Sequence, residues 1–171
     1  MINHPGYYWL AYNYKNLLPS CIDCNRPYKG NSGGILVGKW NQFPVKGFRA
    51  LHPNEESREK PLIINPCEVD PSAHLDIDET GVLQYKSLEG KTTIEVFGLN
   101  TREALVIQRK KTYDAVKNRI TAFILLLINK KDIRVEYSEL DKIKKGEEPY
   151  SIAARKAIND SQILIAPFTA M

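Results

Sequence analysis

Two cysteines near the amino terminus constrain the fold of this 171-residue chain more than any other feature. Cys21 and Cys24 are separated by two residues, come after Pro19 and are followed directly by Asn25. Two thiolates at this spacing can bind one zinc ion from a tight turn, although a closed structural site needs two further ligands. The alternative is a redox pair, but a redox CxxC lies between a strand and the helix that it opens. Since Pro19 and a helical pattern precede this pair, we predict that both cysteines are metal ligands.

The composition is that of an ordinary globular protein of a reducing compartment. Hydrophobic residues make up 43% of the chain and charged residues 26%, which is typical of a single folded domain of this length. Three cysteines are an odd number and argue against a disulfide framework. The longest apolar run, 122–128, is too short to span a bilayer, and we see no signal-peptide pattern. We expect a cytoplasmic protein without membrane contact, whose net charge of +4 permits nucleic-acid binding.

Hydrophobic patterns predict mixed secondary structure in the first hundred residues. Residues 7–18 have a broad apolar face at helical spacing and predict a helix that ends at Pro19. Residues 30–60 show neither a helical nor a strand periodicity and predict a long irregular segment. Short alternating or apolar runs predict three strands, the last two forming a hairpin around the turn 79–81: 62–64, 74–78 and 82–86.

The second half predicts a helical region. Apolar residues at helical spacing predict a long helix over 102–130, capped by Asn100 or Thr101. We expect its apolar positions to be buried in the core: Leu105, Ile120, Phe123, Ile124 and Leu127. Ser138 is expected to cap a short helix to Lys145, and a last helix spans 151–160. The apolar tail 163–171 has no clear assignment.

The stretch around the cysteines also offers candidate functional side chains. They are Asn16, Asn25, Lys29 and the histidine nearest to them in the sequence, His4. From the residues alone, Asn16 also fits a residue at the end of a helix without a functional role, and Asn25 also fits such a residue in a turn. Likewise, Lys29 fits either a phosphate contact or a solvated charge.

The order of these residues resembles the second half of an HNH nuclease motif. The likeness covers most of the chain from His4 to about Ile158 and is collinear with one bacterial branch, the HNH partners of ATPases in Septu- and retron-type phage-defence systems. It is carried by YYWLAYNYKNLLPSCIDCNRPYKG, EKPLIINPCEVDPSAHL, TGVLQY and PYSIAARKAI. The resemblance implies an α+β fold: a partial treble-clef (ββα-metal) zinc-knuckle region with an irregular loop over 1–60, continuous with a β-hairpin and C-terminal helices over 61–171.

The resemblance also implies roles for individual positions. Cys21 and Cys24 match two of four structural zinc ligands. Asn16 and Asn25 match the second and third letters of the motif, with Asn25 at the catalytic Mg²⁺ or Mn²⁺. The nucleic-acid contacts fall on Arg26 and Lys29. The first CxxC and the catalytic histidine of the family have no counterpart in this chain, which leaves His4 as the candidate base.

These implications lead to two functional hypotheses. The first is an HNH-type, divalent-metal-dependent DNA endonuclease of phage defence that is truncated at its amino terminus, so that residues 1–171 alone cleave DNA weakly or not at all. The alternative is a non-catalytic HNH-derived module that docks on a partner ATPase or on nucleic acid. A homo-oligomer is the third possibility for partners, because two copies sharing four cysteines would complete one zinc site.

Overall fold

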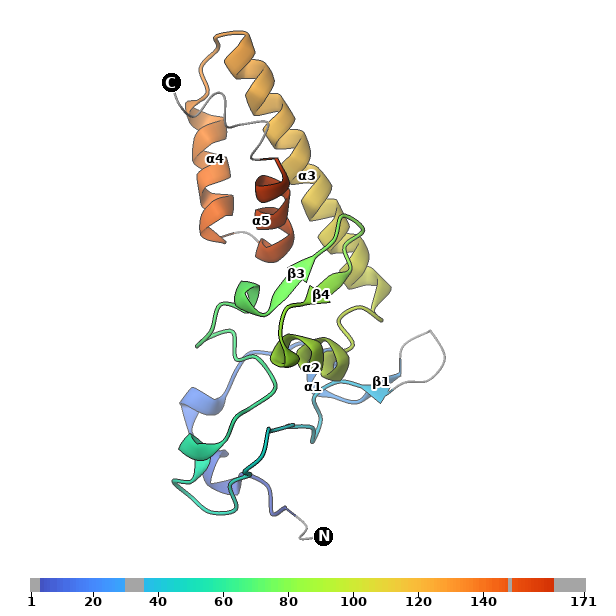
Figure 1. Cartoon of the computed structure of the whole chain (residues 1–171), viewed down its shortest axis with the longest axis vertical. Helices are drawn as coiled ribbons and strands as arrows, with labels where there is room; N and C mark the ends of the chain where they lie inside the picture. The colour runs from blue at the N-terminus through green and yellow to red at the C-terminus, as the bar shows by residue number, and fades with distance from the viewer. Residues whose placement is uncertain (1–3, 30–35, 148, 162–171) are drawn as a thin grey trace.

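The structure, a computed structural model, describes residues 4–29, 36–147 and 149–161. Figure 1 shows an elongated molecule with the carboxyl-terminal helices at one end, the irregular amino-terminal part at the other, and a hairpin and a short helix between them. The 3₁₀ turns, strands and helices follow in chain order: η1 (Tyr8–Leu10), η2 (Tyr14–Asn16), α1 (Ile22–Asn25), β1 (Tyr28–Lys29), β2 (Leu36–Val37), η3 (Glu56–Arg58), η4 (Pro71–Ala73), β3 (Leu75–Ile77), β4 (Leu83–Tyr85), α2 (Leu88–Phe97), α3 (Glu103–Ile128), α4 (Arg134–Lys145) and α5 (Ser151–Asp160). This mixture of helices and small antiparallel sheets confirms the α+β class.

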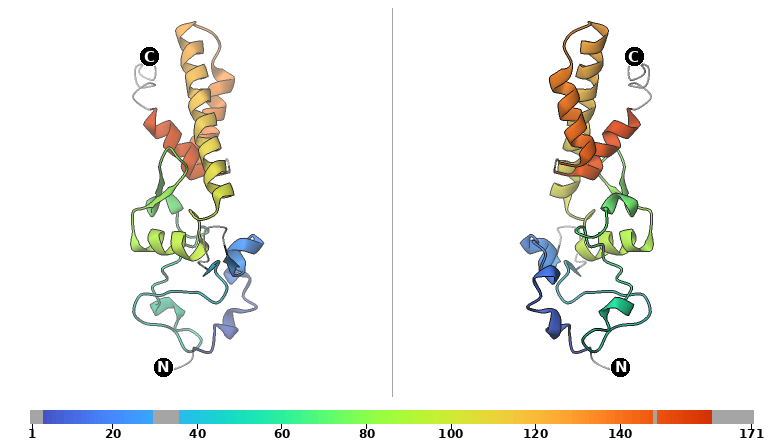
Figure 2. Two further views of the ribbon diagram at one scale, coloured as in Figure 1. Left: turned by 90° about the vertical axis from the view of Figure 1, so that its right-hand side faces the viewer. Right: turned by 90° about the vertical axis from the view of Figure 1, so that its left-hand side faces the viewer.

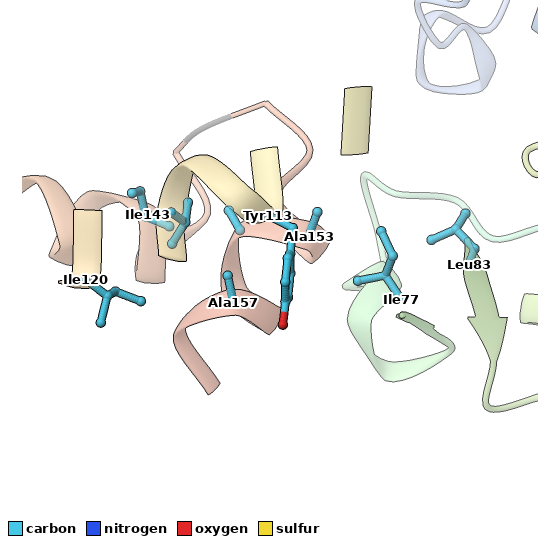
Figure 3. Close-up of a cluster of buried hydrophobic side chains, with 9 residues drawn as sticks. Ile77, Leu83, Tyr113, Ile120, Ile143, Ala153 and Ala157 are labelled. Atoms are coloured by element: carbon cyan, nitrogen blue, oxygen red, sulfur yellow. The ribbon is translucent and has the colours of Figure 1, made fainter. Parts of the chain in front are cut away.

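The main core lies where α3, α4 and α5 meet the β3–β4 hairpin (Figures 2 and 3). Helix α5 contributes only alanines to its buried face, and these small side chains let it approach α3 closely. The buried cluster consists of Ile77, Leu83, Tyr113, Val116, Ile120, Ile143, Ala153, Ala154 and Ala157. None of the helices that the structure describes is long and apolar enough to cross a membrane.

The β3–β4 hairpin is confirmed, and the long helix beside it explains why the hairpin is well anchored. Strand β3 pairs antiparallel with β4, with Ile77 opposite Leu83. The buried guanidinium of Arg109 on α3 donates to the carbonyl oxygens of Gly81, at 3.2 Å, and Leu99, at 2.8 Å. Arg109 is therefore a structural residue of the core, although charged side chains usually lie on the surface.

The predicted cap of the long helix is wrong, because Asn100 and Thr101 have other partners. The Asn100 side chain accepts from Leu83 N and donates to Leu83 O, both at 2.9 Å, and thereby satisfies the free edge of β4. Thr101 Oγ1 donates back to Gly98 O. The N-cap is Arg102, whose side chain makes no capping hydrogen bond.

Three other predicted elements differ from the structure. The helix over 7–18 is instead two short 3₁₀ turns, because the side chains that would form its apolar face stay exposed and bury no common surface. The strand over 62–64 does not form: Ile64 N donates to Thr93 Oγ1 rather than to a neighbouring strand. Helix α4 begins at Arg134, so Ser138 lies inside it.

The region over 88–97, where the sequence favours neither type, is helix α2. The final helix was predicted with its observed bounds. Ile120 and Phe123 are buried as expected, whereas Leu105, Ile124 and Leu127 are only half-buried. The end of α3 projects beyond α5, so part of its apolar surface faces solvent. The predicted apolar tail lies outside the described residues.

We expect Ile120→Ala to lower the free energy of unfolding by about 2–5 kcal/mol, because it deletes a side chain that is only 1% exposed and leaves a cavity. Leu125→Ala on the same helix is the matched control. Its side chain is 54% exposed, so the change should stay within about 0.5 kcal/mol. Urea unfolding followed by circular dichroism measures both values. Equal effects of the two substitutions would contradict the packing described here.

Candidate metal and nucleic-acid site

The two cysteines lie on a single helical turn that presents both sulfurs together. Cys21 is the N-cap of α1, and its Sγ accepts the backbone N–H of Cys24 at 3.4 Å. Asn25 N donates to Cys21 O, which closes the turn. Pro19 cannot donate a backbone hydrogen bond, which favours the absence of regular structure just before this knuckle. The local sequence thus forms a compact CxxC knuckle, as its spacing predicts.

Arg102, which comes about eighty residues later in the chain, closes over the two sulfurs. Its Nη2 donates to Cys24 Sγ at 3.1 Å and to Phe97 O at 2.8 Å, and its Nη1 lies 3.9 Å from Cys21 Sγ. The Nε atom of Arg102 is buried without a hydrogen-bond partner among the described residues. This guanidinium links the cysteine knuckle to the helical part of the molecule.

The surroundings shift the two thiols in opposite directions. The N–H of Cys24, together with the guanidinium of Arg102, stabilises a thiolate at Cys21 and lowers the pKa of that thiol below its usual value. Burial disfavours the charged form of Cys24 and raises the pKa of its thiol, even though Arg102 acts in the other direction. Cys21 is therefore the thiol that is more readily deprotonated, as a metal ligand has to be.

A tight turn over residues 38–42 docks on the backbone of the knuckle. Lys39 N donates to Cys24 O at 2.7 Å, and Trp40 N donates to Asn25 O at 2.9 Å. Gly38 has a φ of +107°, and its Cα packs so closely on the Arg26 carbonyl that any Cβ would overlap it. The same glycine donates its N–H to Val96 O at the end of α2. The turn therefore links the knuckle to the end of α2.

Several predicted site residues lie on the exposed side of this knuckle. Asn25 ends α1 and is exposed, as is Arg26 next to it. Lys29 is exposed on β1, which pairs with β2 opposite Leu36. Asn16 lies on η2, and its Nδ2 donates to Leu10 O at 3.5 Å. Asn25, Arg26 and Lys29 are thus each accessible to a ligand.

His4 lies in a different part of the amino-terminal region and both of its ring nitrogens have partners. Nδ1 accepts the N–H of Gly6 at 3.0 Å, so Nε2 carries the proton that is donated to Ala50 O at 2.8 Å. A general base needs a free ring nitrogen. In this arrangement His4 anchors the chain to the loop that contains Ala50.

A polar and aromatic network holds the segment around His4. The Tyr7 hydroxyl donates to Glu59 Oε1 at 2.7 Å, and Trp9 Nε1 donates to Glu56. Glu59 Oε1 also accepts the N–H of Ala50. Burial and the carboxylate of Glu59 raise the pKa of Tyr7 to about 12, so its hydroxyl stays protonated and remains a donor. Tyr7 and Trp9 therefore fix this loop.

The two other histidines and the third cysteine do not join the knuckle. His74 Nδ1 lies 2.7 Å from Ser87 Oγ, near the start of α2, while His52 and Cys67 are exposed. Among residues 4–29, 36–147 and 149–161, no group of three or more histidine, cysteine, aspartate or glutamate side chains converges on one point. The described residues thus bring two sulfurs together at the knuckle.

Two features of this site escaped the sequence analysis. Arg102 lies at the start of the helix predicted over 102–130, and nothing in local spacing reports a contact across about eighty residues. The docked turn lay within a segment that was predicted only to be irregular. Gly38 was a signal for it, since glycine in an aperiodic segment marks a turn or loop.

Comparison with known proteins gives Septu proteins as relatives. The chain is 43% identical over 106 residues to Septu protein PtuB of Bacillus mycoides (strain KBAB4), covering 60% of this chain and 32% of the relative. It is 36% identical over 119 residues to Septu protein PtuA of the same strain, covering 67% and 15%, and 34% identical over 100 residues to Septu protein PtuB of Bacillus thuringiensis, covering 58% and 29%. No family model and no solved structure matches. The chain is thus similar to Septu proteins PtuA and PtuB, and spans a third or less of their lengths.

Proposed function

We propose that this chain is the DNA-cleaving module of a Septu-type anti-phage system and hydrolyses phosphodiester bonds with a divalent cation. The observation that carries the proposal is the knuckle, in which Asn25, Arg26 and Lys29 are all exposed and follow the two cysteines closely in the sequence. Similarity to Septu proteins supports the defence setting. The HNH-like order of residues in the same segment supports the chemistry.

The residues of the knuckle fit the metals that this function needs. Cys21 and Cys24 would hold half of a tetrahedral zinc site, whose role is to stabilise the fold. Asn25 would contribute an oxygen ligand to Mg²⁺ or Mn²⁺, a cation that stabilises charge on the reacting phosphate. Arg26 and Lys29 would bind neighbouring phosphates and hold the strand in place. Asn16, by its bond to Leu10 O, positions the segment that leads into the knuckle.

A second candidate function is a non-catalytic module that docks on a partner protein or on nucleic acid. The hydrogen bonds made by both His4 nitrogens favour this candidate, since the imidazole must give up one of them before it can accept a proton from water. The similarity to both PtuA and PtuB also fits a module that works within a larger assembly. Dependence of DNA nicking on Asn25 separates the two candidates.

The test is nicking of supercoiled plasmid in Mn²⁺ by the chain and by Asn25→Ala. We expect slow nicking by the unchanged chain and a loss of roughly a hundredfold in Asn25→Ala, because a cation that loses a fixed ligand leaves its productive position. Asn41→Ala, which changes an exposed asparagine of the adjacent turn, is the matched control and should nick at the unchanged rate. Nicking that persists in Asn25→Ala would contradict the proposed site. Plasmid binding without any nicking would favour the second candidate.

A further inference from the structure

Trp40 is unusual in keeping a large apolar ring exposed beside the proposed cleavage site. Its side chain is 57% exposed, although tryptophan is normally buried for most of its surface. The backbone N–H of Trp40 donates to Asn25 O, so the residue that bears the ring is joined directly to the proposed metal ligand. The exposure is thus not that of a residue in a remote loop.

The backbone around Trp40 is held in place by hydrogen bonds. Trp40 has a φ of +39°, a left-handed conformation that bulky residues seldom adopt. Gln42 closes the turn, because its N–H donates to Lys39 O at 2.6 Å and its Nε2 donates to Gly38 O at 3.1 Å. The bonds from Lys39 and Trp40 to the knuckle hold the turn from the other side. Backbone contacts therefore fix the position from which the indole projects.

The stretch of sequence that contains the knuckle and Trp40 is mainly basic. Between Cys21 and Gln42 the sequence contains three cations, Arg26, Lys29 and Lys39, against one acid, Asp23. Arg26 and Lys29 are exposed, and Lys39 precedes the tryptophan in the same turn. Exposed aromatic rings beside basic side chains are the combination that binds single-stranded nucleic acid, the rings stacking on bases and the cations contacting phosphates.

We propose that Trp40 is a stacking platform for an unpaired base, so that this chain prefers single-stranded or locally opened DNA at the knuckle. The inference rests on the proposed DNA-directed function and adds a substrate class to it. The indole can stack only on a base whose face is accessible, whereas both faces of a base within a duplex are covered by its neighbours. Arg26 and Lys29 then contact the phosphates of the strand that leads to Asn25.

The test is a binding titration in the presence of a chelator, so that no cleavage is needed. Three labelled probes are compared: oligo-dT, a DNA duplex and oligo-U. Each is about 12 nucleotides long, within the site sizes usual for strand-binding proteins. We expect oligo-dT to bind roughly tenfold more tightly than the duplex, and no more weakly than oligo-U. Equal affinity for duplex and oligo-dT, or tighter binding of oligo-U, would overturn the inference.

Two substitutions of Trp40 separate stacking from folding. Trp40→Gly removes the ring, and glycine accommodates the positive φ, so the melting temperature should not fall. We expect its affinity for oligo-dT to fall roughly tenfold while its affinity for the duplex is unchanged, whereas Trp40→Phe should retain most of the binding. Tyr137→Ala, which removes an equally exposed ring on α4, is the control and should have no effect. Unchanged oligo-dT binding in Trp40→Gly would refute the proposal.

Fluorescence gives an independent measurement, because the chain has only two tryptophans. Trp9 is bonded to Glu56, and Trp9→Phe leaves Trp40 as the only tryptophan. Stacking should then quench its emission on titration with oligo-dT, and an unaltered emission would count against contact. Strand binding that depends on Trp40 without any nicking would support the inference while the proposed cleavage fails. Nicking that depends on Asn25, combined with unchanged oligo-dT binding in Trp40→Gly, would support the proposed cleavage and refute the stacking platform.

Discussion

Gly38→Ala is expected to lower the free energy of unfolding, or of local undocking of the knuckle, by about 2–6 kcal/mol. The value combines about 1–3 kcal/mol for a non-glycine residue in a left-handed conformation with about 1–3 kcal/mol for overpacking. The added Cβ would overlap the carbonyl oxygen of Arg26, which is backbone and cannot move aside without moving the knuckle. Since whole domains have only about 5–15 kcal/mol of stability, this is a large loss.

Gly47→Ala is the matched control for this substitution. Gly47 also has a positive φ, of +78°, but its Cβ would meet no atom within 4 Å. Its cost should be only the conformational one, about 1–2 kcal/mol. Urea unfolding measures global stability, and the rate of alkylation of Cys24, which is half-buried, reports local undocking. Similar losses in both variants, with no faster alkylation in Gly38→Ala, would show that the close packing on Arg26 has little importance.

Elements with a strong local signal were predictable from the sequence. Helix α5 and the core of α3 have apolar residues at helical spacing, and the β3–β4 hairpin has alternating residues around Gly81, whose φ of +91° requires glycine. The helix expected over 7–18 failed for a physical reason: Tyr7 and Trp9 are committed to Glu59 and Glu56, which a local pattern cannot reveal. Periodicity identifies an apolar face but does not show whether another surface covers it.

The candidate site was predictable only in part for the same reason. Spacing along the chain identified Cys21, Cys24 and Asn25, because a knuckle is a local structure. Arg102 and Trp40 belong to the site through tertiary contacts, which their own residue types do not reveal. His4 was a candidate because it is the histidine nearest the knuckle in the sequence, but proximity along the chain says nothing of its hydrogen bonds to Gly6 and Ala50.

The role of Arg102 has a consequence for metal binding. A zinc ion held by four thiolates carries a net charge of minus two, and the described part of this chain brings two sulfurs together at the knuckle. If two copies each contribute Cys21 and Cys24, each also contributes one guanidinium, and the two Arg102 side chains cancel the charge of the zinc–thiolate group. N–H donors to bound thiolates are also the usual outer partners of such a site.

We therefore expect the purified 171-residue chain to bind one zinc ion per two chains and to become a monomer when a chelator removes it. Cys21→Ser and Cys24→Ser should each abolish zinc binding and lower the melting temperature, because binding free energy of a structural zinc is folding free energy. Cys67→Ser, which changes the exposed third cysteine, should retain the metal.

Arg102→Gln should weaken zinc affinity by roughly ten- to a hundredfold, the usual effect of losing an outer partner. Metal analysis together with light scattering measures the zinc content and the mass of the complex, and a zinc titration with a colorimetric chelator gives the affinity. Zinc that remains after both Cys21→Ser and Cys24→Ser would place the metal elsewhere in the chain. One zinc per chain on a monomer would instead require further ligands within the same copy, and unchanged zinc affinity in Arg102→Gln would limit the guanidinium to joining the knuckle to α2 through Phe97 O.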